Sequence, residues 1–346
     1  MRILAAGDHF VGPDLLIGAV RSELDGDHEI TELKLPWPVE PFGPVGTVHE
    51  ASGTEQQVID ALGGAEVVVT QMAPFTKEVF AAAENLKLVS VCRGGPVNVD
   101  LAAATEAGVA VTYAPGRNAG AAAEFAIGMI LAAMRRISTS SAELLGGTWR
   151  GDYYAYDQAG LEINGTTIGL VGYGAIGSRV AKVLGAFGAE VLVADPYADP
   201  AAVAVDGARV VELDELLRNS HVVSLHARLT EQTRHLIDAE KLALLPHGAI
   251  LVNTARGGLL DYAPLPEALR SGKLGALALD VYDVEPPPAD WALRDVPNVV
   301  ATPHLAGASR QTAERAAAIV AAEVGRYARG ETLANLANPE VLGQRP

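Results

Sequence analysis

Short apolar runs alternate with helical stretches along most of this chain. We predict strands in its first third at residues 2–6, 67–71, 86–92 and 109–113, and helices at 76–84 and 99–107. Later strands are predicted at 222–226, 249–253, 276–282 and 298–303, and later helices at 239–245 and 264–271. Strands that alternate with helices in this way indicate α/β units built on parallel sheets.

Two longer helices are predicted besides these. Residues 118–136 are rich in alanine and carry Phe125, Met129 and Ile130 at helical spacing. A second alanine-rich helix is predicted at 309–329. The stretch 35–53 contains four prolines and several glycines, so we expect a loop there.

The stretch from Ile168 to Asp195 is the most informative part of the sequence. It begins with a short apolar run suited to a strand buried on both faces, and Gly172, Gly174 and Gly177 follow at once in a GxGxxG pattern. A helix with one apolar side comes next, and a second apolar strand then ends at the acidic residue Asp195. The pattern predicts a strand, a tight turn, a helix and a strand.

Each glycine has a mechanical role in this arrangement. Gly172 would form the tight turn, Gly174 would let the backbone approach a pyrophosphate, and Gly177 would allow close packing of helix on strand. Exposed N–H groups at the start of the helix would face the phosphates. GxGxxG alone is a weak signal, but with both strands and the helix in place it favours a dinucleotide site.

Asp195 indicates which dinucleotide binds. Its carboxylate would accept hydrogen bonds from ribose hydroxyls and repel a 2′-phosphate. No arginine or lysine follows at 196–198 to receive such a phosphate. The sequence therefore favours NAD over NADP.

Composition narrows the class of partner and compartment. The formal net charge is −16, which disfavours nucleic acid and anionic membranes as main partners. The single cysteine, Cys92, cannot form an internal disulfide, and the apolar run at the N-terminus is too short for a signal peptide. We therefore expect a cytoplasmic protein. We expect no metal, because the histidines are scattered and no HxxxH or paired-cysteine spacing occurs.

Polar residues just past the carboxyl ends of the predicted strands are candidates for chemistry, since ligands bind there in open parallel sheets. They are His226, Arg256, Glu285 and His304. Arg256 can hold a carboxylate with two parallel N–H bonds. His304 can give a proton to a carbonyl oxygen as hydride arrives, and Glu285 would favour the protonated imidazole and orient it. Taken together, these residues favour hydride chemistry on a 2-oxo acid.

Several motifs in order resemble the D-2-hydroxyacid dehydrogenase family, in particular its phosphoglycerate dehydrogenase-like branch. They are Pro115-Gly116-Arg117-Asn118 leading to Ala123-Glu124-Phe125, the glycine fingerprint, Val223-Ser224-Leu225-His226, Asn253-Thr254-Ala255-Arg256-Gly257, Asp280 to Pro286, and Thr302-Pro303-His304. The resemblance implies that Arg256, Glu285 and His304 are catalytic. It further implies these NAD-binding residues: Gly172, Gly174, Ala175, Ile176, Gly177, Asp195, His226, Thr230, Thr254, Ala255 and Asp280.

The resemblance also implies the organisation of the chain. A Rossmann-type, doubly wound NAD-binding domain at 115–305 would be inserted into a smaller flavodoxin-like α/β substrate domain made of 1–114 and 306–346, with the active site in the cleft between them. Family members are commonly homodimers joined through the cofactor domains. The aromatic segment 148–156 is either a subunit-contact arm or packing beneath the next domain. Because the printed chain ends soon after 309–329, we expect no C-terminal regulatory domain.

Two departures from the family pattern concern the substrate. The loop that resembles the family's Gly-x-Gly-x-Asp-Asn-x-Asp departs from that pattern, since it reads Arg93-Gly94-Gly95-Pro96-Val97-Asn98-Val99-Asp100 here. Arg93, Gly94 and Gly95 would bind the substrate together with Arg256. In the family's His-x-Pro-Leu-Thr pattern, Arg228 replaces the proline. Two additional cations in loops that the resemblance places by the cleft favour a polar or anionic substrate tail, phosphorylated or polyhydroxylated.

Two other readings compete with the enzyme. The corepressors of the C-terminal-binding-protein branch share the fold and keep the Arg, Glu and His, so a non-catalytic NAD-sensing binding protein stays open. Formate dehydrogenases pair the histidine with Gln, where this chain has Glu285, and are disfavoured.

Overall fold

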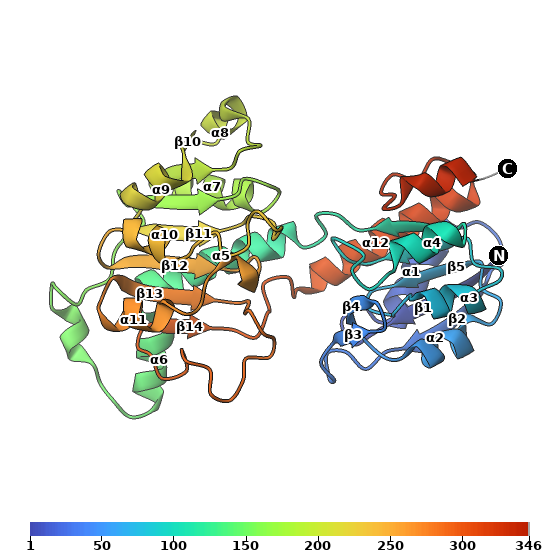
Figure 1. Ribbon diagram of the computed structural model, residues 1–346, viewed down its shortest axis with the longest axis horizontal. Helices are drawn as coiled ribbons and strands as arrows, with labels where there is room; N and C mark the ends of the chain where they lie inside the picture. The colour runs from blue at the N-terminus through green and yellow to red at the C-terminus, as the bar shows by residue number, and fades with distance from the viewer. Residues whose placement is uncertain (345–346) are drawn as a thin grey trace. The chain divides into compact units, whose positions relative to one another are not determined.

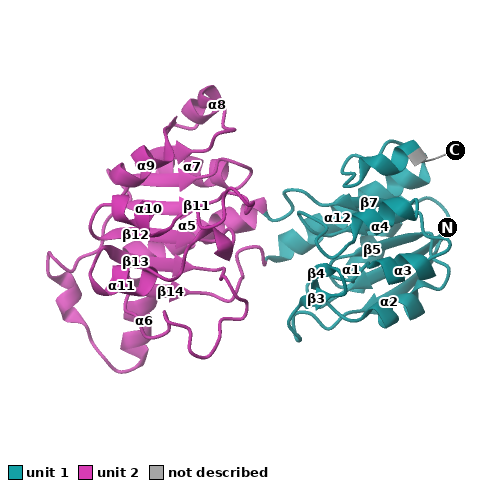
Figure 2. Cartoon of the chain, in the orientation of Figure 1, with its two compact units in different colours: residues 1–118, 309–346 teal, residues 119–308 magenta. Residues whose placement is uncertain are grey.

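The computed structural model describes residues 1–344 as two compact units (Figure 2). Unit 1 comprises Met1–Asn118 together with the C-terminal segment from Ser309. Unit 2 is the continuous segment Ala119–Ala308. The chain thus leaves unit 1 once and returns to it once.

Unit 1 is built on a parallel sheet of five strands in the order β2-β1-β5-β6-β7 (Figure 1). The strands are β1 (Arg2–Gly7), β2 (Glu29–Lys34), β5 (Val67–Thr70), β6 (Leu88–Val91) and β7 (Ala110–Tyr113). Since β2 lies on one side of β1 and the later strands lie on the other, the strand order reverses between β1 and β5. A separate antiparallel pair, β3 (Gly43–Val45) and β4 (Val48–Ala51), lies in the stretch predicted to be a loop.

Helices cover both faces of this sheet. The helices are α1 (Pro13–Glu23), α2 (Glu55–Leu62), α3 (Lys77–Ala82), α4 (Leu101–Glu106) and α12 (Arg310–Ala328), and the 3₁₀ helix η3 (Pro339–Gln344) follows. One core joins the sheet to α1 and α12, and the other joins it to α2, α3 and α4. Successive residues of β1 alternate between the two cores, as the two-residue period of a strand requires.

Unit 2 holds a parallel sheet of seven strands in the order β10-β9-β8-β11-β12-β13-β14. The strands are β8 (Thr167–Val171), β9 (Glu190–Ala194), β10 (Ala208–Val210), β11 (Val222–Leu225), β12 (Ala249–Asn253), β13 (Leu274–Leu279) and β14 (Val299–Ala301). The order reverses between β8 and β11. In an open sheet such a reversal leaves a crevice at the carboxyl ends of the strands, where ligands bind.

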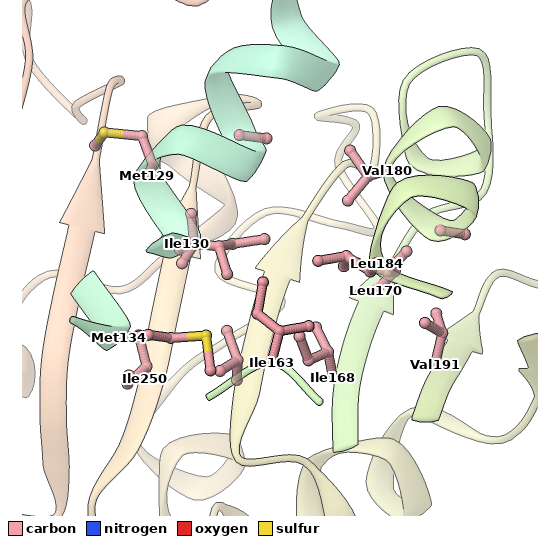
Figure 3. Packing of buried hydrophobic residues seen from close by; sticks show 14 of the residues in the cluster. Met129, Ile130, Met134, Ile163, Ile168, Leu170, Val180, Leu184, Val191 and Ile250 are labelled. Carbon is pink, nitrogen blue, oxygen red and sulfur yellow. The ribbon is translucent and has the colours of Figure 1, made fainter. Parts of the chain in front are cut away.

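Helices again pack on both faces of the sheet in unit 2. They are α5 (Ala119–Met134), α7 (Gly177–Ala186), α8 (Pro200–Val205), α9 (Leu213–Asn219), α10 (Ala239–Leu244) and α11 (Leu265–Arg270), with the 3₁₀ turn η2 (Gly257–Leu259). The helix α6 (Ile137–Leu145) and the 3₁₀ turn η1 (Gly151–Tyr154) bury none of their residues. Figure 3 shows Ile130 and Met134 of α5 packed near Ile168 and Ile250 of the sheet. The opposite core is leucine-rich and lies under α9, α10 and α11.

The predicted strand 276–282 differs from the observed one in a way that matters for the site. β13 begins earlier, at Leu274, and ends at Leu279. Asp280 and Tyr282 therefore lie beyond the strand, and their side chains bond to the segment after β14, at the Thr302 hydroxyl and the Thr302 carbonyl. No helix of the described residues is long and apolar enough to cross a membrane.

Candidate active site

The two loops beside the strand reversal in unit 2 are the glycine fingerprint after β8 and the loop after β11. They lie against each other, because the His226 amide donates to the Val171 carbonyl at 2.7 Å. The crevice expected at a strand reversal is therefore bordered by the residues that the sequence predicts for the cofactor.

The three fingerprint glycines meet different surroundings. A Cβ on Gly172 would lie 2.7 Å from the His226 carbonyl carbon, and Gly172 has φ +102°. A Cβ on Gly177 would lie 2.2 Å from the Gly172 carbonyl oxygen. The chain itself therefore requires these two glycines. No atom lies within 4 Å of a Cβ added to Gly174, which leaves room for a phosphate to approach the backbone.

The start of α7 has donors to offer such a phosphate. Its N-cap, Ile176, makes no side-chain capping hydrogen bond. The first N–H groups of a helix lack partners within the helix and carry the positive end of its dipole. Together with the space beside Gly174, these amides fit the pyrophosphate of NAD.

Asp195 fixes the fingerprint loop from the end of β9. One carboxylate oxygen accepts the Tyr173 amide at 2.7 Å, and the other accepts the Tyr197 amide at 2.8 Å. The side chain remains partly exposed, and each oxygen can accept a further bond. Asp195 can thus hold the loop and still accept bonds from ribose hydroxyls.

His226 is held as a neutral imidazole at the end of β11. Its Nε2 lies 3.0 Å from the Ser224 hydroxyl. Burial lowers the pKa of His226 to about 4, because the charged form would lose its hydration. The residue therefore adds no positive charge beside the cofactor loop at neutral pH.

Arg256 lies on the loop after β12, and a buried asparagine shapes that loop. The Asn253 side-chain amide donates to the Arg256 carbonyl at 2.9 Å, and its oxygen accepts the Ala255 amide at 3.0 Å. The Arg256 side chain itself is exposed and donates to the Ala255 carbonyl at 2.8 Å. Its guanidinium is thus available to a substrate while its backbone is fixed.

Glu285 and His304 form the central pair of the site. The Nδ1 of His304 lies 2.7 Å from Oε2 of Glu285, and the other carboxylate oxygen accepts the Tyr282 amide at 3.0 Å. Burial alone would raise the pKa of Glu285, but the hydrogen bond and charge of His304, the Tyr282 amide and the charge of Arg256 together lower it. The three predicted catalytic residues are therefore coupled within unit 2.

Asp280 holds the loop that carries His304. The side chain is fully buried and accepts three hydrogen bonds, from the Thr302 hydroxyl at 2.6 Å and from the Leu305 and Ala306 amides at 2.8 and 2.7 Å. These donors lie on both sides of His304, whose φ is +54°. Because a side chain at positive φ is strained, the loop needs such anchoring.

Gly257 brings the Arg256 loop against the loop that leads to Glu285. A Cβ on Gly257 would lie 1.8 Å from the Tyr282 carbonyl oxygen, a distance that no side chain tolerates. The absence of a side chain at this position therefore sets the spacing of the two loops.

The predicted substrate residues Arg93, Gly94 and Gly95 lie in unit 1. The Arg93 guanidinium forms an ion pair with Glu50 and donates to the Met72 sulfur at 2.6 Å. No atom lies within 4 Å of a Cβ added to Gly94 or Gly95. Arg93 thus shares its charge with a carboxylate that the sequence did not reveal.

Other predicted residues lie on the same edge of unit 2. Arg228 and Thr230 are exposed on the loop after β11, and Thr254 is buried beside Asn253.

Among the described residues, no group of three or more His, Cys, Asp or Glu is placed to hold a metal.

Sequence reasoning missed the positioning function of Asn253 and the anchoring bonds of Asp280. A signal was present, because each is a polar residue at the end of an otherwise apolar strand. Such a residue must satisfy its polar groups within the fold, and the loop that follows it is the nearest partner.

A protein-family model matches most of unit 2. The model described as D-isomer specific 2-hydroxyacid dehydrogenase, NAD binding domain, matches residues 127–306, just over half of the chain. The prediction of NAD as cofactor is confirmed at the level of this domain.

Known proteins show the same likeness. The chain is 39% identical over 298 residues to the D-3-phosphoglycerate dehydrogenase of Methanocaldococcus jannaschii, covering 85% of this chain and 56% of that protein. It is 36% identical over 298 residues to the glyoxylate reductase of Korarchaeum cryptofilum, covering 86% and 90%. The apo-structure of D-lactate dehydrogenase from Escherichia coli superposes with a TM-score of 0.77 at 26% identity, covering 97% of this chain and all of that one.

These likenesses confirm the predicted fold, a Rossmann-type unit and a flavodoxin-like unit. The chain spans little more than half of the Methanocaldococcus jannaschii protein, and it spans most of the other two. The predicted resemblance is confirmed: the chain belongs to the D-2-hydroxyacid dehydrogenase family, in its phosphoglycerate dehydrogenase-like branch.

Proposed function

We propose that this protein transfers a hydride between NAD(H) and a D-2-hydroxy acid or its 2-oxo acid. The observation that carries the proposal is the 2.7 Å contact between His304 and Glu285, on loops at the carboxyl end of the NAD-binding sheet. A histidine held by a carboxylate is a suitable acid and base at neutral pH.

The residues have distinct parts in the reaction. The fingerprint loop and Asp195 would hold NADH, which would supply the hydride for the substrate carbonyl carbon. Arg256 holds the substrate carboxylate with two parallel hydrogen bonds. His304, whose Nδ1 is engaged by Glu285, gives a proton from Nε2 to the carbonyl oxygen, so that 2-oxo acid becomes 2-hydroxy acid.

The substrate is proposed to carry a polar tail. Support comes from Arg93 and Arg228, cations on loops at strand ends, and from the likeness to proteins named D-3-phosphoglycerate dehydrogenase. The Glu50 carboxylate offsets the charge of Arg93, so the proposal is a polar tail in general.

Spectrophotometry tests the proposal directly. Oxidation of NADH at 340 nm would be followed with glyoxylate, pyruvate, hydroxypyruvate and 3-phosphohydroxypyruvate as acceptors. We expect turnover with at least one of them and little turnover after His304→Ala. NADH binding without turnover on any 2-oxo acid would instead favour an NAD-sensing binding protein.

We propose further that the protein is a homodimer joined through unit 2. Support comes from the segment that follows α6, where large apolar side chains lie in solvent: Trp149 is 82% exposed and Tyr156 100% exposed. The alternative that these two side chains pack beneath the next domain is wrong. Light scattering should give twice the chain mass, and Trp149→Asp should shift it toward one chain mass.

A further inference from the structure

The fingerprint loop carries a tyrosine, Tyr173, between Gly172 and Gly174. A residue between two glycines lies on backbone that has unusual conformational freedom, so the loop keeps one shape only if contacts hold it. The Asp195 carboxylate accepts the Tyr173 amide at 2.7 Å and holds the loop from one side. The hydroxyl at the other end of the same residue has a partner of its own.

That partner is Asp206, which follows α8 and precedes β10. The Tyr173 hydroxyl donates to Oδ2 of Asp206. The Asp206 side chain is 11% exposed, so the bond is largely shielded from water. Burial and this hydrogen bond raise the pKa of Tyr173 to about 12, so the hydroxyl keeps its proton at neutral pH and remains the donor.

Asp206 also lies beside α7, the helix whose first amides fit the pyrophosphate. Its Oδ1 is 3.4 Å from Nζ of Lys182, and a Cβ on Gly185 would lie 3.6 Å from the Asp206 carbonyl oxygen. The Lys182 side chain is largely exposed, so its ion pair contributes little by itself. The contact at Gly185 shows that the turn at Asp206 packs on the helix.

The ring of Tyr173 adds apolar contact to these polar ones. It packs against the core that joins the unit 2 sheet to α5 and α7. The Tyr173 side chain thus connects the loop to the helix, and Asp206 holds the end of that side chain.

An anchored loop matters for binding because the pyrophosphate would contact loop and helix together. A ligand binds less tightly when its site is correctly arranged for only part of the time. A bond that keeps the loop in place against α7 therefore raises the affinity for NAD without touching the cofactor.

We propose that Asp206 is a positioning residue for NAD, which acts through Tyr173 to hold the fingerprint loop against α7 in the shape that receives the pyrophosphate. The inference concerns NAD binding within unit 2. It would stand even if no 2-oxo acid were turned over.

Fluorescence titration of the full chain with NADH provides the first test. Tyr173→Phe keeps the ring in the core and removes the hydroxyl, so we expect the Kd for NADH to rise about fivefold, the net worth of about one hydrogen bond. Adenosine diphosphate ribose carries the pyrophosphate without the nicotinamide, and it should lose affinity by the same factor. A Kd that stays within twofold of wild type for either ligand would overturn the inference.

Variants at Asp206 separate positioning from a purely structural role. Asp206→Ala should raise the Kd for NADH as much as Tyr173→Phe does, and the double variant should bind within twofold of either one, because both changes remove the same bond. Asp206→Asn keeps an oxygen that accepts the hydroxyl, so it should bind NADH within twofold of wild type. Effects that multiply in the double variant, or weak binding by Asp206→Asn, would contradict the inference.

Tyr153→Phe is the matched control. The Tyr153 hydroxyl also donates to a carboxylate of unit 2, that of Glu143, at 2.9 Å. The variant removes the same group from the segment after α6, and its Kd for NADH should stay within twofold of wild type. An equal loss of affinity in this variant would mean that the effect at Tyr173 is a general loss of stability, and the inference would be wrong.

Discussion

His304 has a left-handed backbone, and Asp280 accepts hydrogen bonds from the residues on both sides of it. The His304 imidazole contacts Glu285, and the buried Asp280 carboxylate bonds to the loop that carries His304. Asn253 acts in the same way on the loop of Arg256, one strand away. Two strand-end residues therefore hold the backbone of two reactive loops.

Asp280→Asn should loosen the His304 loop. An amide has one oxygen, so at least one of the three donors loses its acceptor, at a cost of about 2 kcal/mol. We expect kcat to fall about tenfold or more, because small displacements of a reacting group are costly. Steady-state kinetics and thermal unfolding would be measured beside Asp261→Asn, a loop aspartate whose change should leave kcat unaltered.

Glu285→Gln should move the pH dependence of reduction. Removal of the negative charge beside His304 makes protonation of the imidazole less favourable, so the limb that reports it should move to lower pH. The rate at neutral pH should fall about 10²-fold, at the lower end of what acid catalysis contributes. A mutant profile that overlays the wild-type one would remove Glu285 from the mechanism.

Arg256→Ala should weaken carboxylate binding. Loss of two charge-assisted hydrogen bonds corresponds to about 3 kcal/mol, or on the order of a 10²-fold drop in kcat/KM, with a higher KM. Initial rates over a range of substrate concentration give both constants. Arg270→Ala, an exposed arginine at the end of α11, is the matched control, and an equal effect there would contradict the assignment.

Asp195→Asn should reduce the preference for NADH over NADPH. The amide still accepts a backbone bond but no longer repels a 2′-phosphate, and a charge-assisted bond to ribose is lost. We expect the ratio of kcat/KM values for the two cofactors to fall about tenfold. A ratio that stays unchanged would mean that another residue selects the cofactor.

Asp8→Asn should stabilise the protein at neutral pH. With a folded pKa of about 6 against an ordinary value near 3.8, Asp8 favours folding fully only below the lower value, and this contribution is lost as pH rises through about 6. The difference amounts to on the order of 3 kcal/mol. Denaturant unfolding at pH 4 and pH 7.5 should show that the variant gains relative to wild type only at the higher pH.

The fingerprint and the catalytic candidates could be predicted because they depend on local spacing. Gly172, Gly174 and Gly177 follow an apolar run at once, and Arg256, Glu285 and His304 each follow a recognisable apolar run. The contact of Gly172 with His226 and Ala227, by contrast, joins two distant segments and could not be read from this spacing.

Other features depend on contacts between distant segments, and the sequence could not show them. Glu50, which forms an ion pair with Arg93, lies in the β3–β4 hairpin. The sequence predicted a loop there because of the prolines around it. The position of Asp8 and Gln71 at the ends of the adjacent strands β1 and β5 follows from the strand order of the sheet, which neither segment reveals alone.

The interruption of unit 1 by unit 2 bears on how the protein is made. Val320 and Val324 of α12 complete the core on the α1 side of the sheet, yet they are synthesised after the whole of unit 2. A nascent chain that has reached Ala308 can finish unit 2, while one face of the first sheet still exposes its valines and isoleucines. We therefore expect the N-terminal part to stay open to misfolding during synthesis until α12 has been made.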